Sequence, residues 1–423
     1  MAIPVLLRLD NAANIYPASL SKHYSSLYRL SVTLDAPVDG MLLQQALETV
    51  SRRIPTFRCG LEGGGFWWYL RQLGTEPAVT PLAPLRRFRF EEYGGHLFRV
   101  SADGCRIVLD IFHALTDGNG AMTFLLTLTG EYLRLRQGIR IPYGGPVLDP
   151  ADAPDPAEVE DSFKAVFSGR KGALEKNDDA YHIEGTVLPD EGLRDLRFVL
   201  PADRVGDCCH TYGCTVTELM TAAMLCALQE CWRFDLKHVR NDVVKVSVPV
   251  NLRTRYGSRS LRNFASYINL GVDLRNGLLS FEDMLEAVKA GKADLLRPEI
   301  LETKIAANVA LEENMMVRCI PLFLKKRIID WVNRLHGDRF YSQTFSNLGM
   351  VRLPEPVRRY VREVDFVLGR QRQNSGAVAC VGYDGRIFLH LSRKIVENDF
   401  ERNLYDVFDA LGLPVSVSSA VLA

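Results

Sequence analysis

A segment rich in proline and glycine, residues 138–192, interrupts the middle of this chain of 423 residues. Its turn-forming residues include Pro142, Gly144, Gly145, Pro146, Pro150, Pro154 and Pro156. After them come charged residues with few apolar ones, a composition typical of a crossing segment rather than of a packed core. Because a single hydrophobic core rarely grows beyond about 250–300 residues, the segment predicts two lobes, one on each side of it.

The first part of the chain alternates strand and helix patterns. Residues 28–34 alternate like a half-buried strand, and apolar residues at helical spacing follow between Asp39 and Pro55. Residues 66–70 predict an aromatic strand, and residues 106–112 predict a buried one. Glycines then favour a turn, after which a helix is expected from about residue 121 to residue 136.

The second part restarts the same kind of pattern. Thr215 and Glu218 form a capping box, in which each side chain satisfies a backbone amide at the start of a long amphipathic helix. Strands are expected over residues 195–200, 243–250, 267–272, 344–348, 361–368, 377–381 and 387–391, and helices between residue 280 and about 336. We therefore expect two α+β lobes, residues 1–175 (with the crossing segment from about 138) and 190–423.

Composition narrows the classes of function. Lysine plus arginine number 51 and aspartate plus glutamate 51, so the net charge of zero gives no reason to expect a nucleic-acid partner. No window approaches 18 uninterrupted apolar residues, so no membrane span is expected, and the N-terminus lacks the pattern of a signal peptide. Nine cysteines without a C-x-x-C pair suit a reducing compartment, so a cytoplasmic protein is expected.

The strongest chemical signal is a histidine at the end of a predicted strand. His113 leaves the buried strand 106–112, and Asp117 and Gly118 follow it in a turn. The unperturbed pKa of histidine lies near neutrality, so a rigidly held neutral imidazole can accept a proton from a nucleophile. The alternative is that His113 only ends the strand and Asp117 only begins a turn.

The stretch from Ile111 to Gly118 resembles the active-site motif of the acyl-CoA-dependent acyltransferase superfamily. That superfamily includes chloramphenicol acetyltransferase, the condensation domains of peptide synthetases and alcohol acyltransferases. The likeness is greatest to the bacterial alcohol acetyltransferase family. It is also carried by residues 8–17, 66–68, 247–253, Asn263-Phe264, 345–349 and 365–369. The resemblance implies two similar α+β lobes, arranged as a pseudo-dimer with a tunnel between them and the histidine at its middle.

The resemblance also implies roles for individual residues. His113 matches the general base, and Gly118 belongs to the motif turn. Asp117 matches the aspartate that pairs with an arginine of the second lobe, and Arg253 is its expected partner. An equally open alternative makes Arg253 a solvated loop cation.

Ser346 and Asn347 resemble the stretch that lines the tunnel near the acyl carbonyl, where a hydroxyl or an amide can donate to the oxyanion. The alternative is a pair of turn residues before Gly349. Asp365 begins a stretch similar to a structural motif of the plant enzymes, so it is not expected to act in catalysis.

By this resemblance the chain is an O-acyltransferase that moves an acyl group, in the first instance acetyl, from coenzyme A to an alcohol or an amine. The histidine acts as general base without a covalent intermediate. Acyl-CoA is then a cosubstrate, and no permanently bound cofactor or metal is expected. The residues that bind coenzyme A are not identified, although Arg253–Arg262, Arg370 and Arg372 are candidates for its phosphates. A monomer is expected.

Two alternatives remain open. One is a free-standing condensation enzyme whose substrates are bound to an acyl carrier protein. Peptide-synthetase condensation domains usually carry a second histidine directly before the catalytic one, and Phe112 in that position favours simple ester or amide formation. The other is a non-catalytic binding or scaffold protein that retains the fold.

Three further signals are interpreted as structural. The cluster Cys208, Cys209, His210 and Cys214 lacks the ligand spacing of a zinc site. His390 alternates with leucines in a strand and is interpreted as a face-filling residue. The run Lys325-Lys326-Arg327 beside Ile328 and Trp331 suits a membrane surface, but a solvated helix face is the default interpretation.

Overall fold

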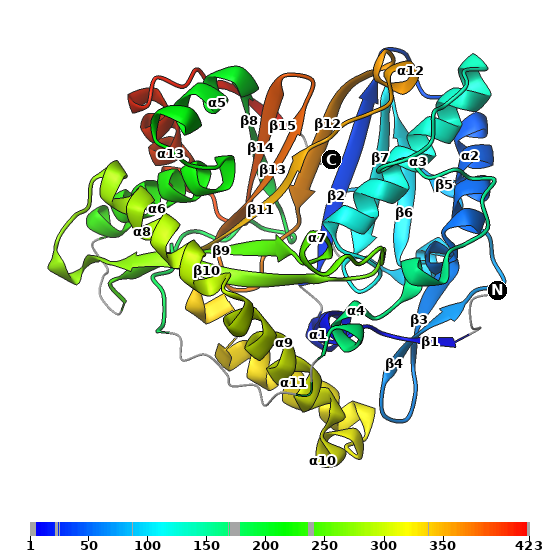
Figure 1. The fold of residues 1–423 in the computed structure, drawn as a ribbon, viewed down its shortest axis with the longest axis horizontal. Coiled ribbons are helices and arrows are strands. Elements are labelled where there is room, and N and C mark those ends of the chain that lie inside the picture. The colour runs from blue at the N-terminus through cyan, green and yellow to red at the C-terminus, as the bar shows by residue number, and fades with distance from the viewer. Residues whose placement is uncertain are drawn as a thin grey trace.

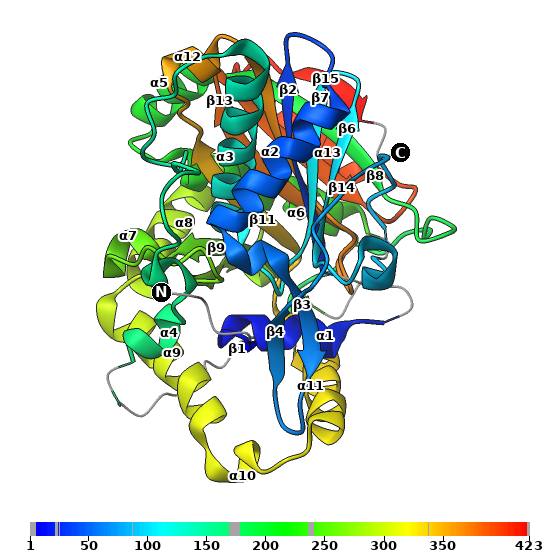
Figure 2. The same ribbon diagram turned by 90° about the vertical axis from the view of Figure 1, so that its right-hand side faces the viewer.

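The first lobe is built on a five-stranded sheet. A computed structural model of the chain describes residues 6–21, 24, 26–86, 88–167, 169, 178–235, 241–336 and 338–420. The strand order is β12 (Val361–Leu368), β2 (Leu27–Leu34), β7 (Arg106–Phe112), β6 (Phe98–Asp103) and β5 (Val79–Thr80). Helices α2 (Gly40–Arg53) and α3 (Gly118–Gln137) pack on this sheet, as Figures 1 and 2 show.

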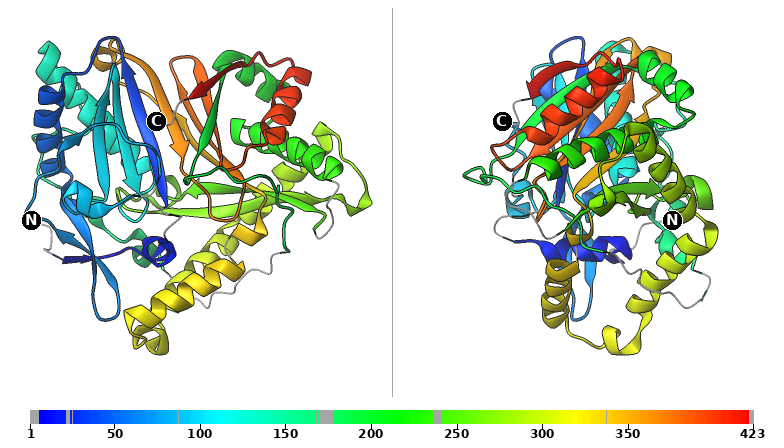
Figure 3. Two further views of the ribbon diagram at one scale, coloured as in Figure 1. Left: turned by 180° about the vertical axis from the view of Figure 1, so that it is seen from behind. Right: turned by 90° about the vertical axis from the view of Figure 1, so that its left-hand side faces the viewer.

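The second lobe is built on a seven-stranded sheet. Its order is β10 (Ala265–Asp273), β9 (Val243–Asn251), β11 (Gln343–Met350), β13 (Gly376–Tyr383), β14 (Arg386–Arg393), β8 (Arg194–Pro201) and β15 (Ser416–Ala420). Its helices are α5 (Ala202–Thr211), α6 (Val216–Phe234), α8 (Phe281–Leu295) and α13 (Asp399–Ala410). Figure 3 shows α6 and α13 on the outer face of this sheet, away from the first lobe. The predicted pair of α+β lobes is therefore present.

A third, three-stranded sheet lies below the first lobe in Figure 1. It joins β1 (Leu6–Arg8), β4 (Trp68–Gln72) and β3 (Cys59–Gly63), and the short helix α1 (Ile15–Ser19) lies beside it. Helices α9 (Pro298–Glu313), α10 (Met315–Arg318) and α11 (Leu322–His336) form a projection beneath both larger sheets (Figure 1). The described residues also form the short helices α4 (Ser162–Ala165), α7 (Arg253–Tyr256) and α12 (Glu355–Arg358), besides several 3-10 turns.

One strand from the second part of the chain joins the first sheet, and strand β13 contributes to the cores of both lobes. Strand β12 comes from the part of the chain assigned to the second lobe, yet it pairs antiparallel with β2 of the first. Strand β13 is buried along its whole length. Its Val378 and Cys380 face the core of the second lobe, whereas Ala379 and Val381 lie in the core of the first. A strand buried on both faces must be apolar throughout, and this sequence is. The exact lobe boundaries remain a prediction. The structure adds that β12, which lies within residues 190–423, pairs with the sheet of the first lobe.

Local sequence explains several of the element boundaries. Asp39 caps α2 by accepting from the amides of Met41 and Leu42, and the predicted capping box of Thr215 and Glu218 begins α6. Asp384, with a φ of 46°, and Gly385, with a φ of 74°, form the tight turn between β13 and β14.

Two expected boundaries differ from the structure. The aromatic strand is β4, which begins at Trp68 rather than at residue 66, because residues 65–67 form the bend after β3. Helix α3 begins at Gly118 rather than at residue 121, so the glycines lie inside its first turn. The physical reason is Asp117, whose carboxylate caps the helix by accepting from the amide of Gly120.

Among the described residues, no single helix is both long enough and apolar enough to cross a membrane. Helices α5 and α6 meet that test only together, as a pair bent by 84°.

Candidate active site at His113

His113 directly follows strand β7, and its backbone is held at the end of the first sheet where β7 ends and β2 begins. Its amide donates to the carbonyl of Ser26 at 2.9 Å, just before β2, and Leu115 closes the turn by donating to the carbonyl of Phe112 at 2.9 Å. The side chain is half-buried. The imidazole therefore leaves a rigid strand end and keeps a partly open face.

Two tyrosines of the first lobe hold the imidazole ring. Tyr16 of α1 stacks on it with ring centroids 4.3 Å apart and planes inclined by 20°. Tyr28 of β2 meets it edge-on at 5.1 Å, and the Tyr28 hydroxyl donates to the carbonyl of Thr116 at 2.9 Å. Contacts on one face and one edge limit rotation of the ring.

The second lobe supplies the hydrogen-bond partner of the ring. Nδ1 of His113 lies 3.1 Å from Oδ1 of Asn263, in the loop before β10. The amide of Asn263 is oriented by Asp10, because Nδ2 of Asn263 donates to Oδ2 of Asp10 at 3.4 Å. With that orientation Oδ1 of Asn263 is an acceptor, so Nδ1 of His113 carries the proton and Nε2 is left with a free lone pair.

Asp10 is fully buried behind Asn263. Burial raises the pKa of its carboxyl group to about 6, although the nearby Arg262 guanidinium, 3.5 Å away, lowers it in part. The Ala13 amide also donates to Oδ1 of Asp10 at 2.8 Å. Asp10 is therefore tied to the N-terminal segment, to the loop of Arg262 and to Asn263, and it connects the segment 8–17 to the histidine.

Burial also lowers the pKa of His113 below its ordinary value of 6.5. The His113 carbonyl, Asp117 and Asn263 each act in the opposite direction but do not cancel this effect. A histidine with such a pKa is neutral at pH 7, which is the form that accepts protons.

Asp117 and Arg253 are in contact, which is the pairing that the family resemblance implied and not the solvated alternative. Nη1 of Arg253 donates to Oδ2 of Asp117 at 2.8 Å, and Nη2 donates to Oδ1 at 3.0 Å. The carboxylate also accepts from the amide of Gly120 at 3.1 Å and from that of Phe264 at 2.9 Å. All of these bonds are used in holding the first turn of α3 to the second lobe, so the geometry suits a structural role.

The two glycines of the motif allow this close approach. A Cβ at Gly120 would stand 2.2 Å from the carbonyl oxygen of Leu261 and 2.2 Å from the hydroxyl of Thr116. A Cβ at Gly118 would stand 2.7 Å from a methyl group of Leu348. Gly120 is therefore needed where the loop of the second lobe meets α3, and Gly118 lies against β11.

The structure separates Ser346 from Asn347. Side chains alternate along β11, and Phe345 lies in the core of the second lobe, whereas Leu348 packs on the first. Asn347 shares the face of Phe345: its Nδ2 donates to the hydroxyl of Thr217 at 3.2 Å, and its Oδ1 accepts from the amide of Gly349 at 2.8 Å. Ser346 shares the face of Leu348, toward Gly118. The donor role of Ser346 stays a prediction, while Asn347 braces β11 against α6.

The arginines considered for coenzyme A all have protein partners, Arg253 through Asp117 as described above. Arg255 donates to the Leu296 carbonyl, Arg259 pairs with Asp155, Arg262 donates to the Arg8 carbonyl, Arg370 donates to the Gly192 carbonyl and Arg372 pairs with Asp330. The Arg259 side chain is 71% exposed despite its pairing with Asp155. The residues that contact the donor phosphates remain unassigned.

The interpretation of His390 as a face-filling residue is wrong. Its Nδ1 lies 2.6 Å from Oδ2 of Asp195, and its Nε2 lies 2.9 Å from Oδ1 of Asp365. Nε of Arg197 donates to the same oxygen of Asp365 at 2.8 Å. Because Asp365 belongs to β12 and the other residues to β8 and β14, this buried cluster joins the sheets of the two lobes.

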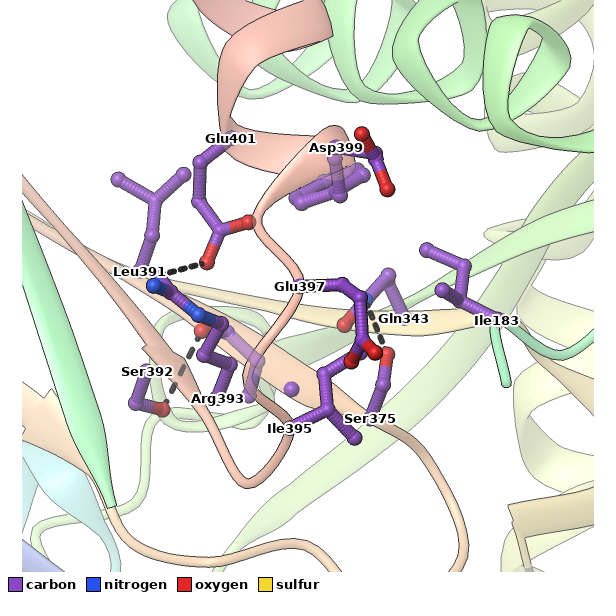
Figure 4. Close-up of a pocket in the computed structure, with 13 residues that line it drawn as sticks. Ile183, Gln343, Ser375, Leu391, Ser392, Arg393, Ile395, Glu397, Asp399 and Glu401 are labelled. Carbon is purple, nitrogen blue, oxygen red and sulfur yellow. Dashed lines mark hydrogen bonds and ion pairs between the residues drawn. The ribbon is translucent and has the colours of Figure 1, made fainter. Parts of the chain in front are cut away.

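Two cavities lie outside this site. One is a pocket of about 20 Å³, where Arg393 donates to Glu401 at 2.7 Å. Figure 4 shows its lining side chains, with Gln343 and Ser375 among them. A more open cleft of about 560 Å³ is lined by Arg53, Thr123, Leu148, Arg259 and Leu261 together with acidic residues. His113 lines neither of them. The tunnel between the lobes therefore remains a prediction.

The sequence alone did not single out four residues around His113, namely Tyr16, Tyr28, Asn263 and Asp10. Asp10, Tyr16 and Asn263 lie in segments that carry the family resemblance, which was the only available signal for them. Their roles depend on contacts between distant parts of the chain.

Comparison with protein families found no family model that matches this chain. Two proteins from strains of Mycobacterium tuberculosis, both described only as uncharacterized, are 29% identical to it over 265 residues. The match covers 59% of this chain and 58% of each of those proteins.

Solved structures match nearly the whole chain. Polyketide synthase associated protein 5 from Mycobacterium tuberculosis has a TM-score of 0.62 at 15% identity, over 96% of this chain and 97% of that one. The trichothecene 15-O-acetyltransferase from Fusarium sporotrichioides also has a TM-score of 0.62, at 12% identity, over 96% and 94%. The first condensation domain of the calcium-dependent antibiotic synthetase has a TM-score of 0.61 at 14% identity, over 96% and 97%. The chain therefore has the two-lobed fold of condensation domains and chloramphenicol-acetyltransferase-like enzymes.

Proposed function

We propose that this chain is an acyltransferase that transfers an acyl group from a thioester to an alcohol, with an amine as the less favoured acceptor. One observation carries the proposal: Nδ1 of His113 is engaged by Asn263, so the basic nitrogen Nε2 is free at a half-buried position between two lobes. The shared fold is the second support, because similar structures include an acetyltransferase and condensation domains.

In the proposed reaction Nε2 of His113 removes the proton of the acceptor hydroxyl as its oxygen attacks the thioester carbonyl. The new C–O bond forms a tetrahedral intermediate, and the Ser346 hydroxyl donates a hydrogen bond to its oxyanion. The C–S bond then breaks, and the imidazolium returns the proton to the departing thiolate. The products are an ester and a free thiol, and no acyl-enzyme forms. Holding donor and acceptor at one imidazole supplies the proximity that the reaction needs.

The donor in this proposal is acyl-CoA, and the acyl group that we expect first is acetyl. A donor bound to an acyl carrier protein is the second candidate, because condensation domains and a polyketide synthase associated protein share this fold. Phe112 before His113 favours the first candidate, since peptide-forming condensation domains usually place a histidine there. Retention of His113 and of its Asn263 contact favours catalysis over a purely structural protein.

A thiol-release assay tests the proposal. Acyl-CoA thioesters of increasing chain length and the same acyl groups on a carrier protein are offered with pooled alcohols and pooled amines. We expect acceptor-dependent thiol release that falls by about 10²–10⁴ in the His113→Ala variant, whose circular dichroism stays unchanged. Equal thiol release by parent and variant would remove His113 as the base. Release only from carrier-bound donors would assign the chain to the second candidate.

A further inference from the structure

Helices α9, α10 and α11 extend away from both large sheets, with α10 at the end of the projection (Figures 1 and 2). Helix α11 contacts the body near α1 and the three-stranded sheet. No step of the proposed reaction uses this projection, so its surface calls for a separate explanation.

The outer surface of the projection is strongly apolar. The accessible fractions are 69% for Met315, 79% for Met316, 66% for Phe323, 42% for Leu324, 47% for Ile328 and 62% for Trp331. Leu324, Ile328 and Trp331 are spaced by four and three residues, so they lie along one face of α11. Single exposed apolar residues are ordinary on a protein surface, but a gathered set of this size indicates a binding surface.

The body holds α11 with this face outward. Lys325 is only 5% exposed; its ammonium donates to the carbonyl of Phe66 at 2.9 Å and lies 3.4 Å from the centre of the Trp67 ring. Arg8 of β1 covers Trp67 as well, at 3.7 Å. A cation therefore points inward while the apolar residues point outward, which reverses the usual arrangement of a surface helix.

The charge within this stretch has one sign, although Glu313 and Asp330 flank it and Asp330 pairs with Arg372. From Met315 to Ile329 the chain carries four cations, Arg318, Lys325, Lys326 and Arg327, and no aspartate or glutamate. Arg318, Lys326 and Arg327 are exposed. We call the exposed set Met315, Met316, Arg318, Phe323, Leu324, Lys326, Arg327, Ile328 and Trp331 the apolar–basic tip.

We propose that the apolar–basic tip docks this protein on the surface of a membrane that contains anionic lipids. Phe323, Ile328 and Trp331 would enter the boundary between headgroups and acyl chains, where tryptophan is favoured. Arg318, Lys326 and Arg327 would meet lipid phosphates and carboxylates. A second copy of the chain is the poorer occupant, because a symmetric pair would bring two cationic surfaces together.

Vesicle sedimentation tests the proposal on the full chain. The parent protein is mixed with phosphatidylcholine vesicles or with phosphatidylcholine vesicles that contain phosphatidylserine. We expect it to sediment with the second kind and to be released by added salt. The double variant Phe323→Ser/Trp331→Ser and the charge reversal Lys326→Glu/Arg327→Glu should each weaken this binding by about tenfold or more. Phe234→Ser on α6, where Phe234 is 69% exposed, is the matched control and should bind like the parent.

The fluorescence of Trp331, taken as the difference between the parent and Trp331→Phe, should shift to shorter wavelength with the anionic vesicles only. Equal sedimentation with both kinds of vesicle, none with either, or equal binding of parent and Phe323→Ser/Trp331→Ser would overturn the proposal. Sedimentation velocity without lipid supplies the last outcome. A dimer that forms in the parent and disappears in the double variant would assign the tip to a second copy of the chain, and this result would also overturn the membrane proposal. None of these results depends on acyltransferase activity.

Discussion

The Nδ1 atom of His113 lies 3.1 Å from the Oδ1 atom of Asn263, across the junction of the two lobes and 150 residues apart in the sequence. Asp10, from the N-terminal segment, in turn orients the Asn263 amide. Three distant segments thus meet at one imidazole. The arrangement leaves Nε2 of His113 as the proton acceptor, so Asn263 is the positioning residue of the proposed site.

Replacing Asn263 by alanine should lower kcat by about 10², with a much smaller change in KM, because the imidazole loses the contact that fixes its tautomer and orientation. Steady-state kinetics with the best thioester measures this split. Nitrogen NMR of the His113 ring should show unprotonated Nε2 in the parent and a mixture of tautomers in Asn263→Ala. If the variant keeps both the parent kcat and a single tautomer, Asn263 is not the positioning residue.

The low pKa of His113 predicts the pH dependence of the proposed reaction. Burial is the main cause of the shift, and Asp117 and Asn263 oppose it only in part. Because only neutral His113 accepts a proton, kcat/KM should fall as the pH drops through the pKa of His113, with a midpoint below 6.5 and a plateau at neutrality. Rates between pH 4.5 and 8 give the profile, with circular dichroism at each pH as the control for folding. A midpoint above 6.5 contradicts the assignment.

Ser346 and Asn347 are adjacent, which makes them a matched pair for testing the oxyanion contact. Ser346→Ala should lower kcat by about 10²–10³, because it removes a donor to the transition state. Asn347→Ala should leave kcat within a few-fold, since its amide bonds to Thr217 and Gly349 within its own lobe. Single-turnover rates for both variants, measured side by side, decide the matter. The reverse ranking would move the donor role to Asn347.

The ion pair of Asp117 and Arg253 should matter for stability. Asp117→Asn leaves the guanidinium, whose side chain is only 13% exposed, without its counter-charge, so the free energy of unfolding should fall by about 3–5 kcal/mol. Asp294→Asn is the control: Asp294 pairs with Arg297 at the surface, where the loss should stay within about 0.5 kcal/mol. Urea unfolding of both variants measures the difference. Equal midpoints for Asp117→Asn and the parent would count against a structural role.

Sequence patterns were a good guide to this molecule where the interactions are local. The strand before His113 and the cap at Thr215 depend on residues within one element, and they were predicted correctly. Arg253 was placed beside Asp117 only through the family resemblance, since nothing local distinguishes it from the neighbouring arginines.

The contacts that escaped prediction are long-range. Asn263 and Asp10 are distant in the sequence and come together only in the tertiary structure. The pairing of β12 with β2 likewise joins strands from opposite ends of the chain. His390 was misinterpreted for the same reason. Its alternation with leucines correctly indicates one face of a strand, but the carboxylates that meet it come from β8 and β12. Periodicity within a strand carries no information about the residues that the opposite sheet supplies.

His390 also gives the protein a predictable dependence of stability on pH. Burial by itself disfavours the imidazolium, but the charge of Asp195 and the hydrogen bonds to Asp195 and Asp365 outweigh this effect and raise the pKa of His390 to about 9. A histidine whose pKa rises on folding stabilises the protein fully below its unfolded pKa of about 6.5, and this contribution is lost as the pH rises through 9. A shift of that size corresponds to roughly 3 kcal/mol.

The free energy of unfolding should therefore decrease between pH 6.5 and pH 9, and the His390→Gln variant should lack this part of the decrease. Lys394 acts in the opposite direction, because burial lowers its pKa to about 8. Its burial destabilises the folded protein at low pH, and the free energy of unfolding increases as this cost disappears between pH 8 and pH 10.5. The difference between parent and His390→Gln cancels the Lys394 contribution. Urea unfolding at intervals from pH 6 to pH 10 gives that difference. If it is the same at every pH, His390 is not a charged link between the two sheets, and the lobes are joined by their other contacts, among them the ion pair of Asp117 and Arg253.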